Sequence, residues 1–143
     1  MSDMDRTDPG GPDGASVVEV KTAATAALIP TIRAVASDLA ARADFDLDAI
    51  SDLRMAVDEA CATLVDIAAP GSSLRCAFSV HDERIGVEAE VDVAAPDTTV
   101  STDTFGWRVL QTLADEVELV GAKDNGRPTI GIKLDKRAAA LPR

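Results

Sequence analysis

The stretch ISDLRMAVDEACATLVDIA, residues 50–68, carries the strongest periodic pattern in this chain of 143 residues. Its apolar residues recur at every third or fourth position, which predicts an amphipathic helix with one buried face. Asp46 or Asp48 can serve as its N-cap, and Pro70-Gly71 ends it. The predicted buried face consists of Ile50, Leu53, Val57, Ala60, Cys61, Leu64 and Ala68.

The residues before this helix predict a disordered arm, a strand and another helix. Residues 1–14 are rich in Asp, Gly and Pro, a composition that buries too little apolar surface to offset the entropy of ordering. From Ser16 an alternating pattern predicts a short strand. A helix then begins near Ala26 or Ala27, so that Pro30 falls in its first turn. Its apolar stripe is Leu28, Ile32, Val35, Leu39 and Ala43.

The residues after this helix predict a hairpin, a polar loop, a third helix and a second hairpin. The loop covers residues 94–104 and ends in a helix cap at Ser101 to Asp103. Asn125-Gly126 is a strong turn signal, and residues 137–143 form a frayed tail. The predicted elements are strands over residues 74–80, 85–93, 117–121 and 129–134 and a helix over 104–114.

This β-α-α-β-β-α-β-β order predicts one domain over residues 15–136. All helices must cover the same face of a largely antiparallel sheet, so the fold class is a two-layer α/β sandwich.

Composition narrows the classes of function. With 14 basic and 25 acidic residues the net charge is −11, which argues against nucleic-acid binding and favours a basic protein partner. The sequence contains no apolar run that could span a membrane and no secretory signal, so we expect a cytoplasmic protein. Cys61 and Cys76 have no neighbouring Cys or His, which predicts buried, reduced thiols.

Two positions are candidates for chemistry. Glu59 and Thr63 lie one helical turn apart, which suits activation of a hydroxyl or binding of Mg²⁺. Spacing alone is weak evidence, because a Glu on a helix is usually only solvated. Asp92 ends a strand before an irregular loop, where it suits either a ligand's amino group or a turn cap. The common phosphate-binding and hydrolytic motifs are absent from the sequence.

The segments DLRMAVDEACATLV (52–65), GWRVLQTLADEVELV (106–120) and RPTIGIKL (127–134) resemble parts of one family. They are similar to the N-box helix, the second glycine box with its following strand, and the final strand of RsbW-type anti-sigma factors and serine-protein kinases. These belong to the GHKL (Bergerat-fold) ATPase superfamily, whose sheet is mixed and largely antiparallel. The resemblance covers about residues 16 to 135 and is greatest to actinobacterial regulators of sigma-F-type factors.

The resemblance implies a role for five residues. Glu59 matches the general base that activates a serine hydroxyl of the substrate protein, and Thr63 stands where the family has its Mg²⁺-binding Asn. Asp92 matches the adenine-binding Asp, but Ala94 to Pro96 replace the glycine box that follows it. Gly106 is the one match in the second glycine box. Thr129 matches a Thr that completes the adenine site.

The resemblance therefore implies an ATP and Mg²⁺ site whose Asn and glycine boxes are altered. It implies a protein that sequesters an alternative sigma factor, is antagonised by a STAS-type anti-anti-sigma factor and forms a homodimer. Two alternatives remain open: an active serine-protein kinase that phosphorylates the anti-anti-sigma factor, or an acidic α/β ligand-binding module unrelated to transcription. Sequestration requires only an interface, so it tolerates the altered boxes better than catalysis does.

Overall fold

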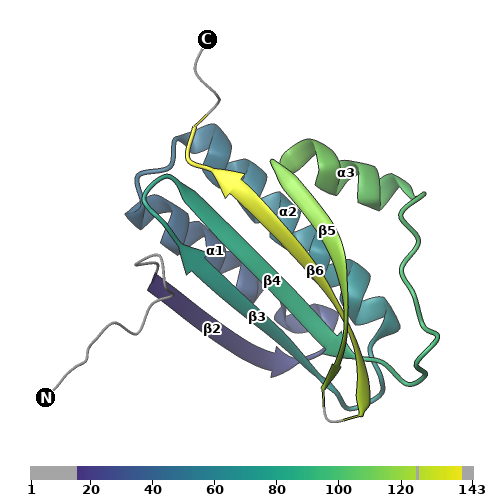
Figure 1. Ribbon diagram of the computed structural model, residues 1–143. Coiled ribbons are helices and arrows are strands. Elements are labelled where there is room, and N and C mark those ends of the chain that lie inside the picture. The colour runs from purple at the N-terminus through teal and green to yellow at the C-terminus, as the bar shows by residue number, and fades with distance from the viewer. Residues whose placement is uncertain (1–15, 125, 140–143) are drawn as a thin grey trace, which may run out of the picture.

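The computed structural model describes residues 16–124 and 126–139. The predicted arm at residues 1–14, Asn125 of the predicted turn, and residues 140–143 of the predicted tail lie outside them. The elements follow the predicted order (Figure 1). They are β2 (Ser16–Ala23), a 3₁₀ turn η1 (Ala26–Leu28), α1 (Ile29–Arg42), α2 (Leu47–Ile67), β3 (Ser73–Val80), β4 (Arg84–Asp92), α3 (Phe105–Leu113), β5 (Glu116–Asp124) and β6 (Arg127–Arg137).

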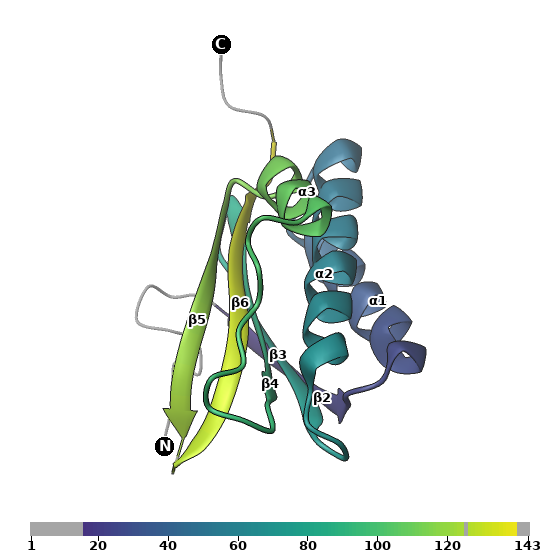
Figure 2. The same ribbon diagram turned by 90° about the vertical axis from the view of Figure 1, so that its right-hand side faces the viewer.

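The five strands form one sheet in the order β2-β3-β4-β6-β5. Every neighbouring pair is antiparallel, so the sheet is antiparallel throughout rather than only largely so. The three helices cover one face of the sheet, and among the described residues no helix covers the other, which is called the open face below (Figure 2). The predicted two-layer α/β sandwich is confirmed.

Helix α2 lies at the centre of the helical layer and contacts α1, α3 and the strands β3, β4 and β6. The Asp46 carboxylate caps it by accepting a hydrogen bond from Ala49 N at 2.8 Å. Five of the seven residues predicted for its buried face are buried, while Ile50 and Ala68 are half-buried. The buried side chains of α2 are Ala49, Leu53, Ala56, Val57, Ala60, Cys61 and Leu64.

The predicted apolar stripe of α1 faces the core only in part. The buried residues of the helix are Ile29, Ile32, Ala36 and Ala40. Val35, Leu39 and Ala43 flank them and pack half-buried against the core, and Leu28 is half-buried. Alanines at the centre of a contact allow two helices to approach closely, and the larger side chains then fill the space beside it. Packing against α2 therefore decides which of two helical stripes faces inward.

The last two strands are longer than predicted, and part of the predicted tail is ordered. Strand β6 continues to Arg137, which pairs with Arg84 of β4. The Asp115 carboxylate accepts a hydrogen bond from Arg137 N at 2.7 Å, and Ala138 N donates to Glu83 O at 2.9 Å. These backbone hydrogen bonds explain why β6 continues beyond Leu134, the last apolar residue of its alternating pattern.

Both cysteines are free and buried, as predicted. A hydrogen bond with Cys61 and burial in the core raise the pKa of the Cys76 thiol. The thiol therefore stays protonated and contributes to packing as a small apolar group. Within the part of the chain that the structure describes, no helix is long and apolar enough to cross a membrane.

Replacing Leu53 by Ala tests the orientation of α2. Leu53 is fully buried, so we expect L53A to lower the free energy of unfolding by about 2–5 kcal/mol, measured by urea denaturation. Met55 on the same helix is 46% exposed, and M55A should change it by less than about 0.5 kcal/mol. Equal effects of the two substitutions would contradict the orientation.

Candidate functional site

The first part of the candidate site lies on the half-buried flank of α2. Glu59 and Thr63 are one turn apart, so their side chains project side by side. Thr63 Oγ1 donates a hydrogen bond to Glu59 Oε2 at 3.4 Å. This contact holds the carboxylate on the helix flank, and it leaves the second carboxylate oxygen for another donor.

Gly106, in the first turn of α3, brings that helix to the Glu59 carboxylate. A Cβ atom at Gly106 would overlap Glu59 Oε2, so only a glycine permits this approach without displacing the carboxylate. Thr104 caps α3 by accepting a hydrogen bond from Trp107 N at 3.1 Å. The positive end of α3 therefore faces a carboxylate, an electrostatically favourable arrangement.

Asp92 is not brought to this site. Its carboxylate contacts Arg75 Nη2 at 3.0 Å and Arg127 Nη1 at 3.5 Å. Its neighbours Val91 and Val93 are buried in the core, and alternation along the strand places Asp92 on the opposite, open face of the sheet. Asp92 and Glu59 are therefore separated by the sheet itself.

Arg75 is the centre of an ionic network on the open face. Its Nε donates to Glu90 at 3.0 Å while its Nη2 donates to Asp92. Burial lowers the pKa of the guanidinium, but the hydrogen bonds to Glu90 and Asp92 raise it by more, so the pKa lies above its ordinary value. The predicted candidates included neither Arg75 nor Arg127. Their only signal in the sequence is their alternation with apolar residues on β3 and β6.

Thr129 lies opposite Asp92 in the pairing of β4 with β6, and it is 5% exposed. It borders a cavity of about 370 Å³ between the end of the sheet and the loop that joins β4 to α3. Val93 N donates to Pro128 O at 3.0 Å and closes one side. The cavity is lined by Val93, Pro96, Thr98, Thr99, Val100, Leu119, Val120, Gly121, Pro128, Thr129 and Ile130.

None of these lining residues is charged. Threonine hydroxyls and backbone groups are the polar atoms available to a ligand there, and they offer no cation to a phosphate. Neither Glu59 nor Asp92 is among the lining residues. The five predicted residues thus fall into two places: Glu59, Thr63 and Gly106 lie together, and Asp92 and Thr129 lie opposite one another on β4 and β6, with Thr129 also bordering the cavity.

Comparisons with known proteins show the family to which this chain belongs. Residues 22–130 match the family described as histidine kinase-like ATPase domain. The chain is also 35% identical over 150 residues to the anti-sigma-F factor RsbW from two strains of Mycobacterium tuberculosis. The alignment covers 100% of this chain and 86% of each relative. The chain belongs to the histidine kinase-like ATPase family and is of the RsbW type.

Two residues that the resemblance assigns to a magnesium-nucleotide site differ from the expected pattern in this RsbW-type domain. Thr63 offers a hydroxyl where an amide is expected, and Asp92 points away from the helices. Groups of three or more His, Cys, Asp or Glu side chains suited to a metal ion are absent from the described residues. The Glu59 carboxylate, held by Thr63 and next to the first turn of α3, is able to accept a proton or a hydrogen bond from a donor group.

The predicted cap of α3 at Ser101 to Asp103 was placed too early. The N-cap is Thr104, whose side chain bonds Trp107 N. Ser101 instead accepts a hydrogen bond from Asp103 N at 3.2 Å within the loop. Several adjacent residues have capping side chains, and the packing of Trp107 and Leu110 in the core selects among them.

Substitution of Asp92 by Asn tests its place in the RsbW-type domain. The change removes the carboxylate that faces Arg75 and Arg127, so D92N should lower the free energy of unfolding by about 1 kcal/mol in denaturant titration. Asp97, exposed in the loop, provides the matched control, and D97N should leave stability unchanged. If D92N were as stable as wild type but bound ATP more weakly than wild type, the result would contradict this structural role and indicate that Asp92 binds the nucleotide.

Proposed function

We propose that this protein is an anti-sigma factor that sequesters a sigma-F-type RNA polymerase sigma factor. The observation that carries the proposal is its 35% identity, across the whole chain, to proteins named anti-sigma-F factor RsbW. Sequestration needs a complementary surface and no nucleotide chemistry, so it is compatible with the altered Asn and glycine boxes.

The helical face has the properties of a surface for such a partner. Met55 on α2 and Phe105 at the start of α3 are exposed apolar side chains on the two helices that carry Glu59 and Gly106. Phe105 is 79% exposed and Met55 46%. Apolar anchors within an acidic surface favour a partner that carries basic and apolar residues, as expected of a sigma factor.

A second candidate function is phosphorylation of a STAS-type anti-anti-sigma factor. The observation that favours it is the contact of Glu59 with the first turn of α3, because a carboxylate held there is placed to accept a proton from a substrate serine. An acidic α/β ligand-binding module is the third candidate. In the first two, the anti-anti-sigma factor competes for the same domain in the cytoplasm, and the protein acts as a homodimer.

Size-exclusion chromatography with light scattering tests the proposal. The purified protein is mixed with a sigma-F-type factor, with and without Mg-ATP. We expect a complex that forms equally in both conditions. A complex that requires Mg-ATP would favour the nucleotide-dependent kinase, and the lack of any complex would contradict the anti-sigma function and leave the ligand-binding module.

Replacement of Glu59 by Gln separates binding from catalysis. E59Q keeps the shape and removes the charge, so sigma-factor affinity should stay within about twofold of wild type, measured by titration calorimetry. If the protein is a kinase, transfer of labelled phosphate to the anti-anti-sigma factor should fall by 10²-fold or more, the contribution typical of a general base. A folded E59Q variant that loses the sigma factor would contradict this assignment.

A further inference from the structure

Lys136 places a charged group on the helical side of the sheet. It lies on β6 directly opposite Ile85 of β4, which is fully buried, so both side chains point toward the helices. The side chain of Lys136 is only 14% exposed. An ammonium group that is largely removed from water needs partners, since an unpaired buried charge is costly.

The two partners of this ammonium group belong to two different helices. It donates a hydrogen bond to the backbone oxygen of Leu113, the last residue of α3, at 2.9 Å. It also donates to Asp52 Oδ2 of α2 at 3.2 Å. The last carbonyls of a helix have no partner within the helix, and a cation there is electrostatically favourable. The last turn of α3 contains no basic residue of its own, so Lys136 of β6 supplies this cation.

The opposite end of α3 meets the same helix, α2. Gly106, in the first turn of α3, approaches the Glu59 carboxylate. Glu59 and Asp52 are seven residues apart on α2, and Gly106 and Leu113 are seven residues apart on α3. Seven residues advance a helix by about 10.5 Å and nearly two full turns, so each pair lies on one flank of its helix. Helix α3 therefore runs antiparallel along one flank of α2 and is attached to it at two points with matching spacing.

The remaining attachments of α3 hold it on the core but do not fix its direction. Trp107 and Leu110 are buried, and hydrophobic burial is not directional. Residues 93–104, which form no helix or strand, join α3 to β4, whereas only residues 114–115 join it to β5. A small change in the direction of α3 about its C-terminal end therefore displaces its first turn most.

We propose that Lys136 is a positioning residue. By joining the end of α3 to Asp52, it holds α3 in the direction that keeps Gly106 against the Glu59 carboxylate and Phe105 on the helical face. The inference rests on the proposed function only in one respect, which is the assignment of Phe105 to the sigma-factor surface.

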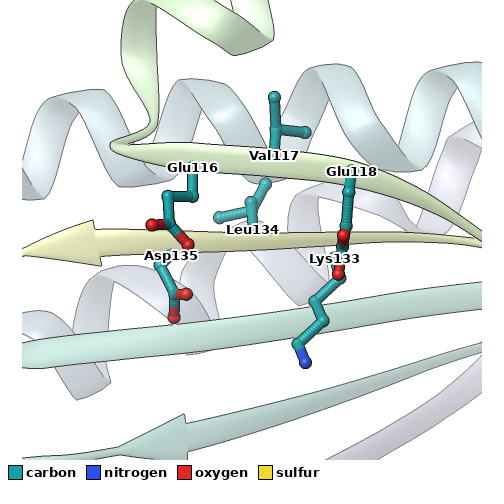
Figure 3. Close-up of a pocket in the computed structure, with 6 residues that line it drawn as sticks. All are labelled: Glu116, Val117, Glu118, Lys133, Leu134 and Asp135. Atoms are coloured by element: carbon teal, nitrogen blue, oxygen red, sulfur yellow. The ribbon is translucent and has the colours of Figure 1, made fainter.

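Lys133 provides a matched control on the same strand. It is exposed on the open face, opposite Glu88 of β4 and Glu118 of β5. Figure 3 shows its side chain on that face, where it lines a pocket of about 370 Å³. Replacing Lys133 by Met removes the same charge from β6 and leaves both attachments of α3 intact.

Hydrogen exchange of the full chain tests the attachment. We expect K136M to raise the exchange rates of the α3 amides by about tenfold or more and to leave those of β3 and β4 unchanged, because only α3 loses a partner. Trp107 is the only tryptophan of the chain, and its fluorescence emission should shift to longer wavelength as α3 moves. K133M should match wild type in both measurements, and K136R, which keeps a cationic donor, should lie closer to wild type than K136M.

A residue that only stabilises the fold would give a different pattern. L53A destabilises the core without touching this attachment, so it should raise exchange in the sheet as well as in α3 and leave the emission of the folded protein unchanged. If circular dichroism shows that K136M is unfolded, D52N replaces it, because Asp52 is half-buried and its substitution weakens only one of the two contacts. The inference is refuted if the folded variant matches K133M, or if exchange rises equally in all elements.

Sigma-factor affinity tests the consequence of this position. Where wild type binds a sigma-F-type factor, K136M should raise the dissociation constant by about tenfold, because Phe105 is no longer held in place, and K133M should leave it unchanged. Unchanged affinity of K136M would overturn the positioning role. If wild type itself binds no sigma factor, the proposed function fails, while exchange and fluorescence still decide whether Lys136 holds α3.

Discussion

The packing of α2 against the inner face of the sheet is the interaction on which the remaining structure depends. The buried side chains of α2 meet three strands and both other helices, and their periodicity fixes the rotation of the helix about its axis. That rotation places Glu59 and Thr63 on the flank where α3 begins. The position of the candidate site therefore follows from core packing. Gly106 is the residue at which α3 approaches the Glu59 carboxylate of α2.

The elements themselves could be predicted from the sequence because their patterns are local. A period of 3.6 marks α2, a period of two marks β3 and β4, and Asp46 is a strong cap signal. The inward face of α1 could not be predicted, since two stripes with helical spacing were available. Close approach to α2 selects the alanine-containing stripe, and this is a property of the pair of helices rather than of either sequence segment.

The site was predictable to a similar degree. The proximity of Glu59 and Thr63 follows from their position on one helix, whereas the approach of Gly106 depends on how α3 docks. Asp92 was identified by its place at the end of a strand and by resemblance, and Thr129 by resemblance alone, and neither signal specifies the face of the sheet. Because successive residues of a strand point to opposite sides, the burial of Val91 and Val93 commits Asp92 to the open face and to Arg75.

Strand β6 follows every other described element in the chain, yet it lies inside the sheet, between β4 and β5. During synthesis on the ribosome β5 therefore has no strand to pair with, and β4 lacks one of its two neighbours, until β6 has emerged. Pairing of Arg84 with Arg137 also closes a large loop, which makes this step slow compared with hairpin formation. Strands β2, β3 and β4 can pair with one another before that point, but the half of the sheet that contains β5 is completed only by the last described strand.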